Sequence, residues 1–182
     1  MAVDSHDHIW VLHRPGPLAK DERLGGATMT PPRAECCTPA PPVLVFDQEG
    51  KLLSSWGGPG QGYDWPTTEH GIFVDAKDNV WLGGNGPKDD QVLKFTAQGK
   101  FIAQFGHAGK SGGSADTQNL GGPANLTVDS VNNELYVADG YGNRRVAVID
   151  TETLTLKRMW GGYGNKPDDK NLGPYKIGRA HV

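Results

Sequence analysis

Two groups of residues in this sequence, the six histidines and the two cysteines, have side chains that could bind metal ions or transfer protons. The adjacent Cys36 and Cys37 do not form a disulfide framework, and a cysteine zinc site normally needs two intervening residues and a second pair. Their role and the redox environment therefore stay open. His6, Asp7 and His8 lie on a predicted turn, where we expect alternating side chains to diverge into solvent.

The elements that must position such residues are short strands joined by tight turns. Residues 123–150, PANLTVDSVNNELYVADGYGNRRVAVID, contain apolar, β-branched runs separated by Asp, Asn and Gly clusters. Alternating apolar residues indicate half-buried strands, and Asp, Asn and Gly favour tight turns. This stretch predicts a meander of antiparallel strands.

The same order of strands and turns occurs twice more, and each copy closes with a fourth strand. The closing strands end at Trp56-Gly57, Phe105-Gly106 and Trp160-Gly161. Repeats of four short strands are typical of radially repeated sheets. We therefore expect an all-β chain, a β-propeller of four-stranded antiparallel blades. The predicted blades cover 1–57 with a loop insertion at 13–42, 69–106 and 123–161.

Equivalent positions of the copies carry related residues, which we interpret as structural. One aspartate per copy is expected to accept backbone N–H groups in a turn: Asp4, Asp75 and Asp129. One aromatic residue per second strand is expected to pack between blades: Trp10, Trp81 and Tyr136. Asp139, Asn143 and Arg145 are expected to tie strand turns together.

Three blades cannot close a ring, so we expect residues 1–182 to be a single partial propeller domain, about half of a six-bladed ring. Residues 164–173 resemble the connector between the second and third copies, residues 175–182 have no repeat pattern, and we expect 164–182 to be an irregular, truncated tail. Self-association through the open blade faces is the alternative to further blades. The formal charge of −3 without a basic stripe argues against nucleic acid, and no apolar run is long enough to span a membrane.

Residues 135–146, LYVADGYGNRRV, resemble an NHL repeat, a type of propeller blade that usually occurs in rings of six. About residues 1–162 also resemble the N-terminal half of the peptidyl-α-hydroxyglycine α-amidating lyase (peptidylamidoglycolate lyase) family. That resemblance rests on MAVDSHDHIWVLHR at the start, on Glu69-His70-Gly71-Ile72, and on Asp139-Gly140-Tyr141.

The resemblance implies roles for individual residues. His70 would be one of three imidazoles on a catalytic zinc ion, Tyr141 the general base, and Arg14 the group that holds the substrate carboxylate. A structural calcium ion would take main-chain oxygens at Met1 and Ile72. The family cleaves peptidyl-α-hydroxyglycine to a peptide amide and glyoxylate, a carbon–nitrogen lyase reaction, and the resemblance implies an extracellular or periplasmic location.

These roles are chemically consistent with one another. Zinc with an open coordination position lowers the pKa of a bound substrate hydroxyl, and the tyrosinate form of Tyr141 could take its proton. The guanidinium of Arg14 could bind the carboxylate through two parallel hydrogen bonds. The family's other two zinc histidines lie in later blades, however, and one imidazole cannot hold catalytic zinc. We therefore expect this fragment to be inactive alone. His70 as a hydrogen-bonded inner-strand residue, Tyr141 as a turn aromatic and Arg14 as an exposed loop residue stay as alternatives.

Two functions follow from the sequence. The first is a metal-dependent lyase acting on a small peptide-like substrate, with enzyme activity uncertain for this chain. The second is a non-enzymatic propeller that binds a protein or a small ligand, because the same fold serves both purposes.

Overall fold

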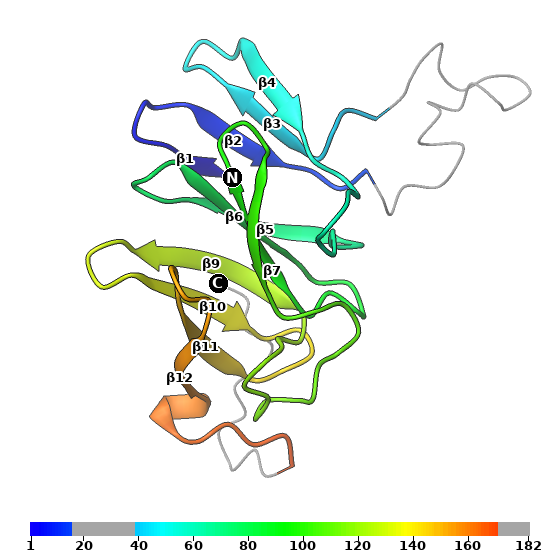
Figure 1. Ribbon diagram of the computed structural model, residues 1–182, viewed down its shortest axis with the longest axis vertical. Helices are drawn as coiled ribbons and strands as arrows, with labels where there is room; N and C mark the ends of the chain where they lie inside the picture. The colour runs from blue at the N-terminus through cyan, green and yellow to red at the C-terminus, as the bar shows by residue number, and fades with distance from the viewer. Residues whose placement is uncertain (16–38, 171–182) are drawn as a thin grey trace, which may run out of the picture.

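The computed structural model describes residues 1–15 and 39–170, which form three four-stranded antiparallel sheets with the strands in sequence order (Figure 1). The first sheet contains β1 (Ala2–Val3), β2 (Ile9–Leu12), β3 (Val43–Phe46) and β4 (Leu52–Trp56). The second contains β5 (Glu69–Val74), β6 (Asn79–Gly84), β7 (Val92–Thr96) and β8 (Phe101–Phe105). The third contains β9 (Pro123–Asp129), β10 (Glu134–Asp139), β11 (Arg145–Asp150) and β12 (Leu156–Trp160). This confirms the prediction of propeller blades.

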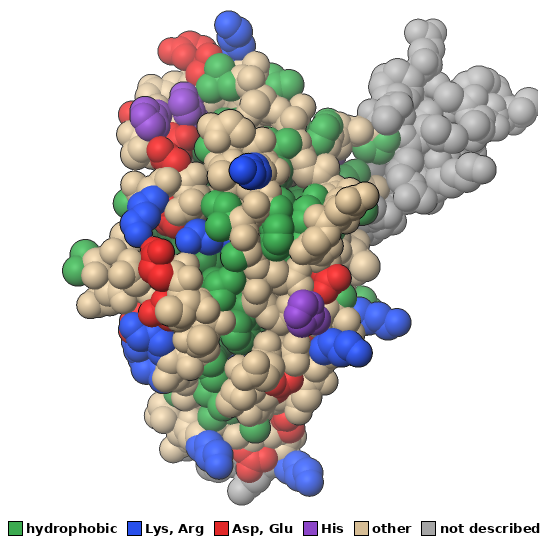
Figure 2. Space-filling model, in the orientation of Figure 1, with side chains coloured by type: hydrophobic (Ala, Val, Ile, Leu, Met, Phe, Trp, Pro, Cys, Tyr) green, Lys and Arg blue, Asp and Glu red, His purple; other side chains and the backbone are tan. Residues whose placement is uncertain are grey.

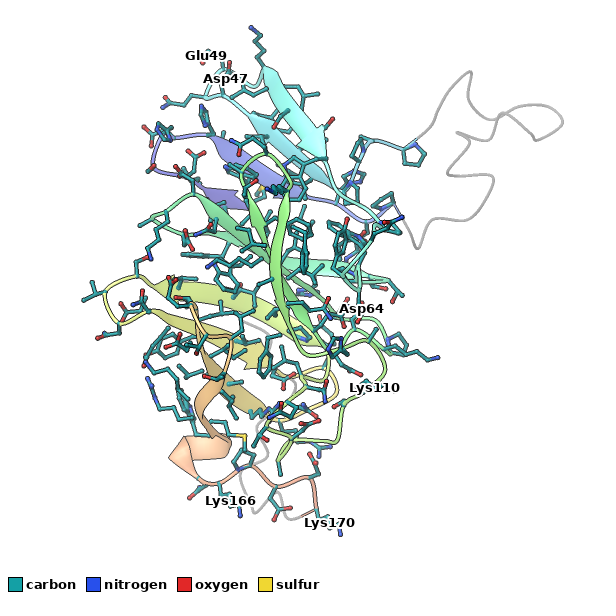
Figure 3. The ribbon with its side chains drawn as sticks, viewed as in Figure 1. Asp47, Glu49, Asp64, Lys110, Lys166 and Lys170 are labelled. Carbon is teal, nitrogen blue, oxygen red and sulfur yellow. The ribbon has the colours of Figure 1, made fainter. Side chains whose placement is uncertain are left out.

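The sheets follow one another along the long axis of the molecule, with the first blade at the top of Figure 1 and the third at the bottom. Asp47 and Glu49 mark the β3–β4 turn at one end, and Lys166 and Lys170 follow the short 3₁₀ turn Gly162–Gly164 at the other (Figure 3). In the part of the chain that the structure describes, no helix is long and apolar enough to cross a bilayer. Cys36, Cys37 and most of the predicted insertion lie outside the described residues.

The turn between the first two strands of each blade is built around the predicted aspartate. The Asp75 carboxylate accepts the backbone N–H groups of Lys77 and Asn79, and Trp81 Nε1 donates to it at 2.9 Å. Asp4 is used in the same way, with Trp10 Nε1 at 3.0 Å. Burial raises the pKa of Asp4, but these hydrogen bonds outweigh burial and lower the pKa to about 2.

Two apolar cores hold the blades together, one at each junction. The first joins Trp10 and Val45 of blade one to Val80 and Leu82 of blade two. The second joins blades two and three and includes Trp81, which is fully buried. The prediction that recurring second-strand aromatic residues pack between blades is therefore confirmed for both tryptophans.

For Tyr136, which is half-buried, packing between blades stays a prediction, because the described residues contain no blade after the third. Its hydroxyl donates to Glu134 Oε2 at 2.8 Å, and the Arg158 guanidinium lies 5.8 Å from its ring centroid. Arg158 and Lys157 both pair with Glu134, and the Trp160 ring lies 6.4 Å from the Tyr136 ring in an edge-on arrangement. The surroundings of Tyr136 within blade three are therefore partly charged and partly aromatic.

Asp139 and Arg145 form a fully buried ion pair in which Nε lies 2.8 Å from Oδ2. Asn143 Nδ2 donates to the same carboxylate, and the guanidinium also donates to the carbonyl of Asn119. The pair therefore ties the connector 106–122 to blade three, which is the structural role expected from the sequence.

Candidate functional site

His70 lies in a β-bulge at the start of β5, the inner strand of blade two. Glu69 pairs with Gly84 and Gly71 pairs with Gly83, so His70 is the extra residue between two ladder pairs. A bulge releases one residue from the ladder and redirects its side chain. The His70 imidazole is half-buried and reaches across to the inner strand of blade three, β9.

Blade three has a register shift at the same place, and the two irregularities meet. Asn125 pairs with Ala138 and Pro123 with Asp139, which leaves Ala124 as the extra residue. The Ala124 carbonyl accepts a hydrogen bond from His70 Nδ1 at 2.7 Å. Because a carbonyl can only accept, Nδ1 carries a proton, and in the tautomer whose single proton is on Nδ1 the other nitrogen, Nε2, is an acceptor.

Gly71 makes this meeting possible, because β5 and β9 approach closely at this residue. A Cβ atom at Gly71 would lie 2.7 Å from the Ala124 carbonyl oxygen. Real Cβ atoms do not approach backbone oxygens that closely, so any other residue would push the two strands apart. The His-Gly dipeptide thus supplies both the imidazole and the space that it needs.

Tyr141 meets the other nitrogen of the same imidazole. Its hydroxyl lies 2.9 Å from His70 Nε2, and the two rings are 5.1 Å apart at 65°. With the proton on Nδ1, the Tyr141 hydroxyl donates to Nε2. The β10–β11 loop that carries Tyr141 is held against the connector, since Gly142 N donates to Gly121 O at 2.6 Å.

Arg14 reaches the same strand entry from blade one. Its Nε donates to the Glu69 carbonyl, one residue before His70, and its side chain is otherwise largely exposed. Arg14 and Tyr141 occupy corresponding loops, after the second strand of blade one and of blade three. The structure therefore brings Arg14, His70 and Tyr141 to the start of β5 from three different blades.

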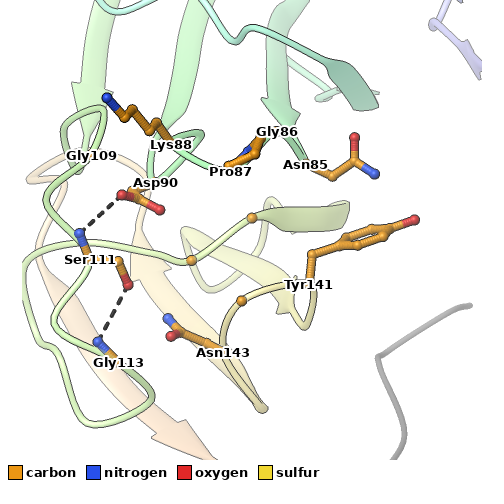
Figure 4. A pocket seen from close by; sticks show the side chains of 13 residues that line it. Asn85, Gly86, Pro87, Lys88, Asp90, Gly109, Ser111, Gly113, Tyr141 and Asn143 are labelled. Atoms are coloured by element: carbon orange, nitrogen blue, oxygen red, sulfur yellow. Dashed lines mark hydrogen bonds between the residues drawn. The ribbon is translucent and has the colours of Figure 1, made fainter.

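A cavity of about 630 Å³ adjoins Tyr141 between the loops of blades two and three. Figure 4 shows Tyr141 on the opposite side of this cavity from Asp90 and Ser111, with its hydroxyl directed away from them. Asp90 Oδ2 accepts the Ser111 amide at 3.0 Å, and Lys88 is the cation among the lining residues. Tyr141 thus forms one wall of a cavity between the loops of blades two and three.

The described residues do not complete a zinc site at His70. Within residues 1–15 and 39–170, no group of three histidine, cysteine, aspartate or glutamate ligand atoms close enough for one ion includes it. Both His70 nitrogens are also engaged, one with a carbonyl and one with a phenol. Within the described residues His70 is hydrogen-bonded through both nitrogens, and its role as a zinc ligand stays a prediction.

Met1 and Ile72, the positions implied for calcium, belong to the inner edges of neighbouring blades. Met1 directly precedes β1 and is exposed, whereas Ile72 is in β5 and its side chain is part of the first core. The strands β1 and β5 are in contact. Calcium binding by their main-chain oxygens stays a prediction.

Three features of this region were missed at the level of sequence. The Ala124 carbonyl has no side-chain signature, and neither bulge is marked by an unusual residue apart from the glycine that follows His70. The third is the arrangement of the His6-Asp7-His8 turn, where the prediction of diverging side chains is wrong. The two imidazole rings stack with their centroids 5.8 Å apart.

No family model and no curated protein matches this sequence. Similar solved structures include the WD40 repeats of RRP9, with 14% identity, a TM-score of 0.46, and coverage of 68% of this chain and 33% of that chain. Sqt1 of Saccharomyces cerevisiae has 13% identity and a TM-score of 0.45, covering 68% and 30%. BamB of Moraxella catarrhalis has 18% identity and a TM-score of 0.37, covering 65% and 34%. The chain spans about a third of the length of these structures.

Proposed function

We propose that this chain is a propeller binding module whose site at the start of β5 takes a small, peptide-like ligand with a carboxylate group. The observation that carries the proposal is the His70–Tyr141 hydrogen bond of 2.9 Å, formed between side chains of different blades beside Arg14. A polar pair assembled between separate elements is suited to orienting a ligand. A guanidinium at its edge is suited to gripping a carboxylate.

The division of tasks follows from the contacts. Arg14 uses Nε for the Glu69 carbonyl, and its two terminal nitrogens are the atoms that would take the two carboxylate oxygens. The Tyr141 hydroxyl can exchange its bond to His70 for a polar group of the ligand. The adjoining cavity would hold the rest of a peptide-like chain.

The test is a calorimetric titration with N-acetylglycine and with its methyl ester. We expect the acid to bind and the ester to bind at least about tenfold more weakly, since it cannot form the two-pronged ion pair. Arg14→Gln should remove this preference. Arg158→Gln on the outer strand β12 is the matched control and should bind like the wild type. Equal binding of acid and ester would refute the proposal.

A second candidate is the lyase reaction on peptidyl-α-hydroxyglycine, carried out by a longer protein that contains this chain. The observation that favours it is the gathering of Arg14, His70 and Tyr141, the three residues for which the family resemblance implies roles. Because the described residues do not complete a zinc site at His70, this activity requires further ligands from outside them. The structural calcium ion that the resemblance implies at Met1 and Ile72 would also belong to this longer protein.

Glyoxylate release separates the two candidates. The proposed binding module should bind α-hydroxyhippurate without accelerating its breakdown at saturating Zn²⁺. Zinc-dependent release of glyoxylate by the full-length protein, lost in Tyr141→Phe, would instead establish the lyase.

A further inference from the structure

The turn between β1 and β2 gathers three potential metal ligands on the rim opposite the site at His70. One ligand atom from each of Asp4, His6 and His8 lies within 4.8 Å of the others. Figure 2 shows histidine side chains beside acidic ones over this turn. The convergence follows from Asp7, whose φ of 62° curls the backbone so that the flanking imidazoles stack.

The spacing of these atoms is close to that around a single ion. Asp4 Oδ2 and His8 Nδ1 are 3.0 Å apart, whereas a tetrahedral ion with bonds of about 2.1 Å separates its ligand atoms by roughly 3.4 Å. An ion can therefore replace the proton that Asp4 and His8 share. His6 is exposed, so its ring can rotate to close the remaining distance.

Blade two provides an internal comparison, because it has the same turn without histidines. Asp75 there accepts the amides of Lys77 and Asn79, which occupy the positions of His6 and His8. Asp78 has a φ of 58°, matching Asp7. The turn is thus fully formed with lysine and asparagine, so its fold does not account for the two imidazoles in blade one.

The cluster opens into a cavity of about 450 Å³ between blades one and two. Asp78 also lines this cavity, and its Oδ1 accepts the Ser5 hydroxyl at 3.3 Å. An ion bound at the turn would keep one position facing this space, where water or a ligand could reach it. A second carboxylate nearby adds negative charge that favours a cation.

We propose that Asp4, His6 and His8 form a binding site for a divalent transition metal of the zinc class, with one coordination position open to the cavity. Two imidazole nitrogens with one carboxylate oxygen form a donor set that Zn²⁺ accepts, whereas Mg²⁺ and Ca²⁺ prefer sites made of oxygen atoms alone. The site is separate from the one at His70, and the proposal does not depend on the proposed function.

The test is a titration of the metal-free protein with Zn²⁺ by calorimetry, in a Cys36→Ser/Cys37→Ser background that removes both thiols. We expect one equivalent to bind and to raise the melting temperature. His6→Lys/His8→Asn gives blade one the residues of blade two, so the turn should fold while the equivalent is lost. Unchanged Zn²⁺ binding by this double variant would overturn the proposal.

Two further variants keep the result interpretable. His6→Gln changes only an exposed ring and should weaken Zn²⁺ binding about tenfold or more, even if the double variant folds poorly. His70→Gln should retain the equivalent, which separates this site from any metal bound at the start of β5. Loss of binding in His70→Gln, with His6→Gln unaffected, would contradict the assignment. Bound Co²⁺ should show visible absorption that His6→Gln diminishes.

Discussion

At the scale of single residues, burial distinguishes the structural ion pair of Asp139 and Arg145 from the side chains of the proposed binding site. Asp139 and Arg145 are fully buried and compensate each other, with further hydrogen bonds to the connector. Burial raises the pKa of Asp139 even though Arg145 opposes the shift. The Arg14 and His70 side chains are more accessible, as expected for groups that meet a ligand.

Replacing Arg145 with alanine should destabilise the fold strongly, because it leaves the Asp139 carboxylate buried without a counter-charge. We expect the free energy of unfolding to fall by about 3–5 kcal/mol in urea denaturation. The neighbouring Arg144 is exposed and pairs with Asp169 on the surface, so Arg144→Ala should cost less than about 1 kcal/mol.

The deficit of Arg145→Ala should shrink as the pH falls. A carboxyl group whose pKa is raised in the folded state binds its proton more readily there than in the unfolded chain, so protonation favours folding. Lowering the pH through the raised pKa of Asp139 removes the uncompensated charge. A deficit that grows with acidity would contradict this explanation.

At the scale of elements, the inner strands β5 and β9 form the site at the points where their pairing is irregular. The bulges at His70 and Ala124 bring an imidazole and a carbonyl together across two blades. Gly71 allows the approach, because it carries no side chain where β5 meets β9. The site therefore depends on backbone irregularity as much as on side chains.

Gly71→Ala should separate these two strands. The added methyl group would meet the Ala124 carbonyl oxygen at 2.7 Å, so we expect a loss of about 1–3 kcal/mol in stability. The shift should also weaken the His70 contact, visible as changed imidazole resonances. Thr127→Ala, an exposed change on β9, should stay within about 0.5 kcal/mol of the wild type.

The strands could be predicted from the sequence, whereas the contacts between blades could not. Alternating apolar residues and repeated aspartate turns are local patterns, and the structure follows them closely. Bulges depend on pairing between distant segments, so the sequence around His70 does not reveal them. The stacking of His6 and His8 escaped prediction because it depends on the positive φ of Asp7. The contacts of Tyr136 with Glu134 and Arg158 join β10 to the distant β12, so they too could not be predicted from local sequence.

At the scale of the whole molecule, stability comes from two junctions between blades, each with its own apolar core. The blades of such repeats cannot bury their faces alone, so each junction contributes to the stability of both neighbours. The site at His70 spans the junction of blades two and three, and the proposed metal site faces the cavity between blades one and two. Binding at either site should therefore stabilise a junction.

Trp81→Ala should open the junction between blades two and three. Trp81 is fully buried, and its Nε1 donates to Asp75, so we expect a loss of about 3–5 kcal/mol. Trp160 is only half-buried on β12, and Trp160→Ala should cost clearly less in the same denaturation experiment. Equal losses would show that the junction does not carry this stability.

The most direct test of the central claim is the ¹⁵N resonance spectrum of the His70 imidazole during titration with N-acetylglycine. The Ala124 carbonyl requires a proton on Nδ1, and ligand binding should shift the Nε2 resonance as the Tyr141 contact changes. Tyr141→Phe should shift Nε2 before any ligand is added. A ring protonated on Nε2 alone, or an Nε2 resonance insensitive to both the ligand and Tyr141→Phe, would contradict the account.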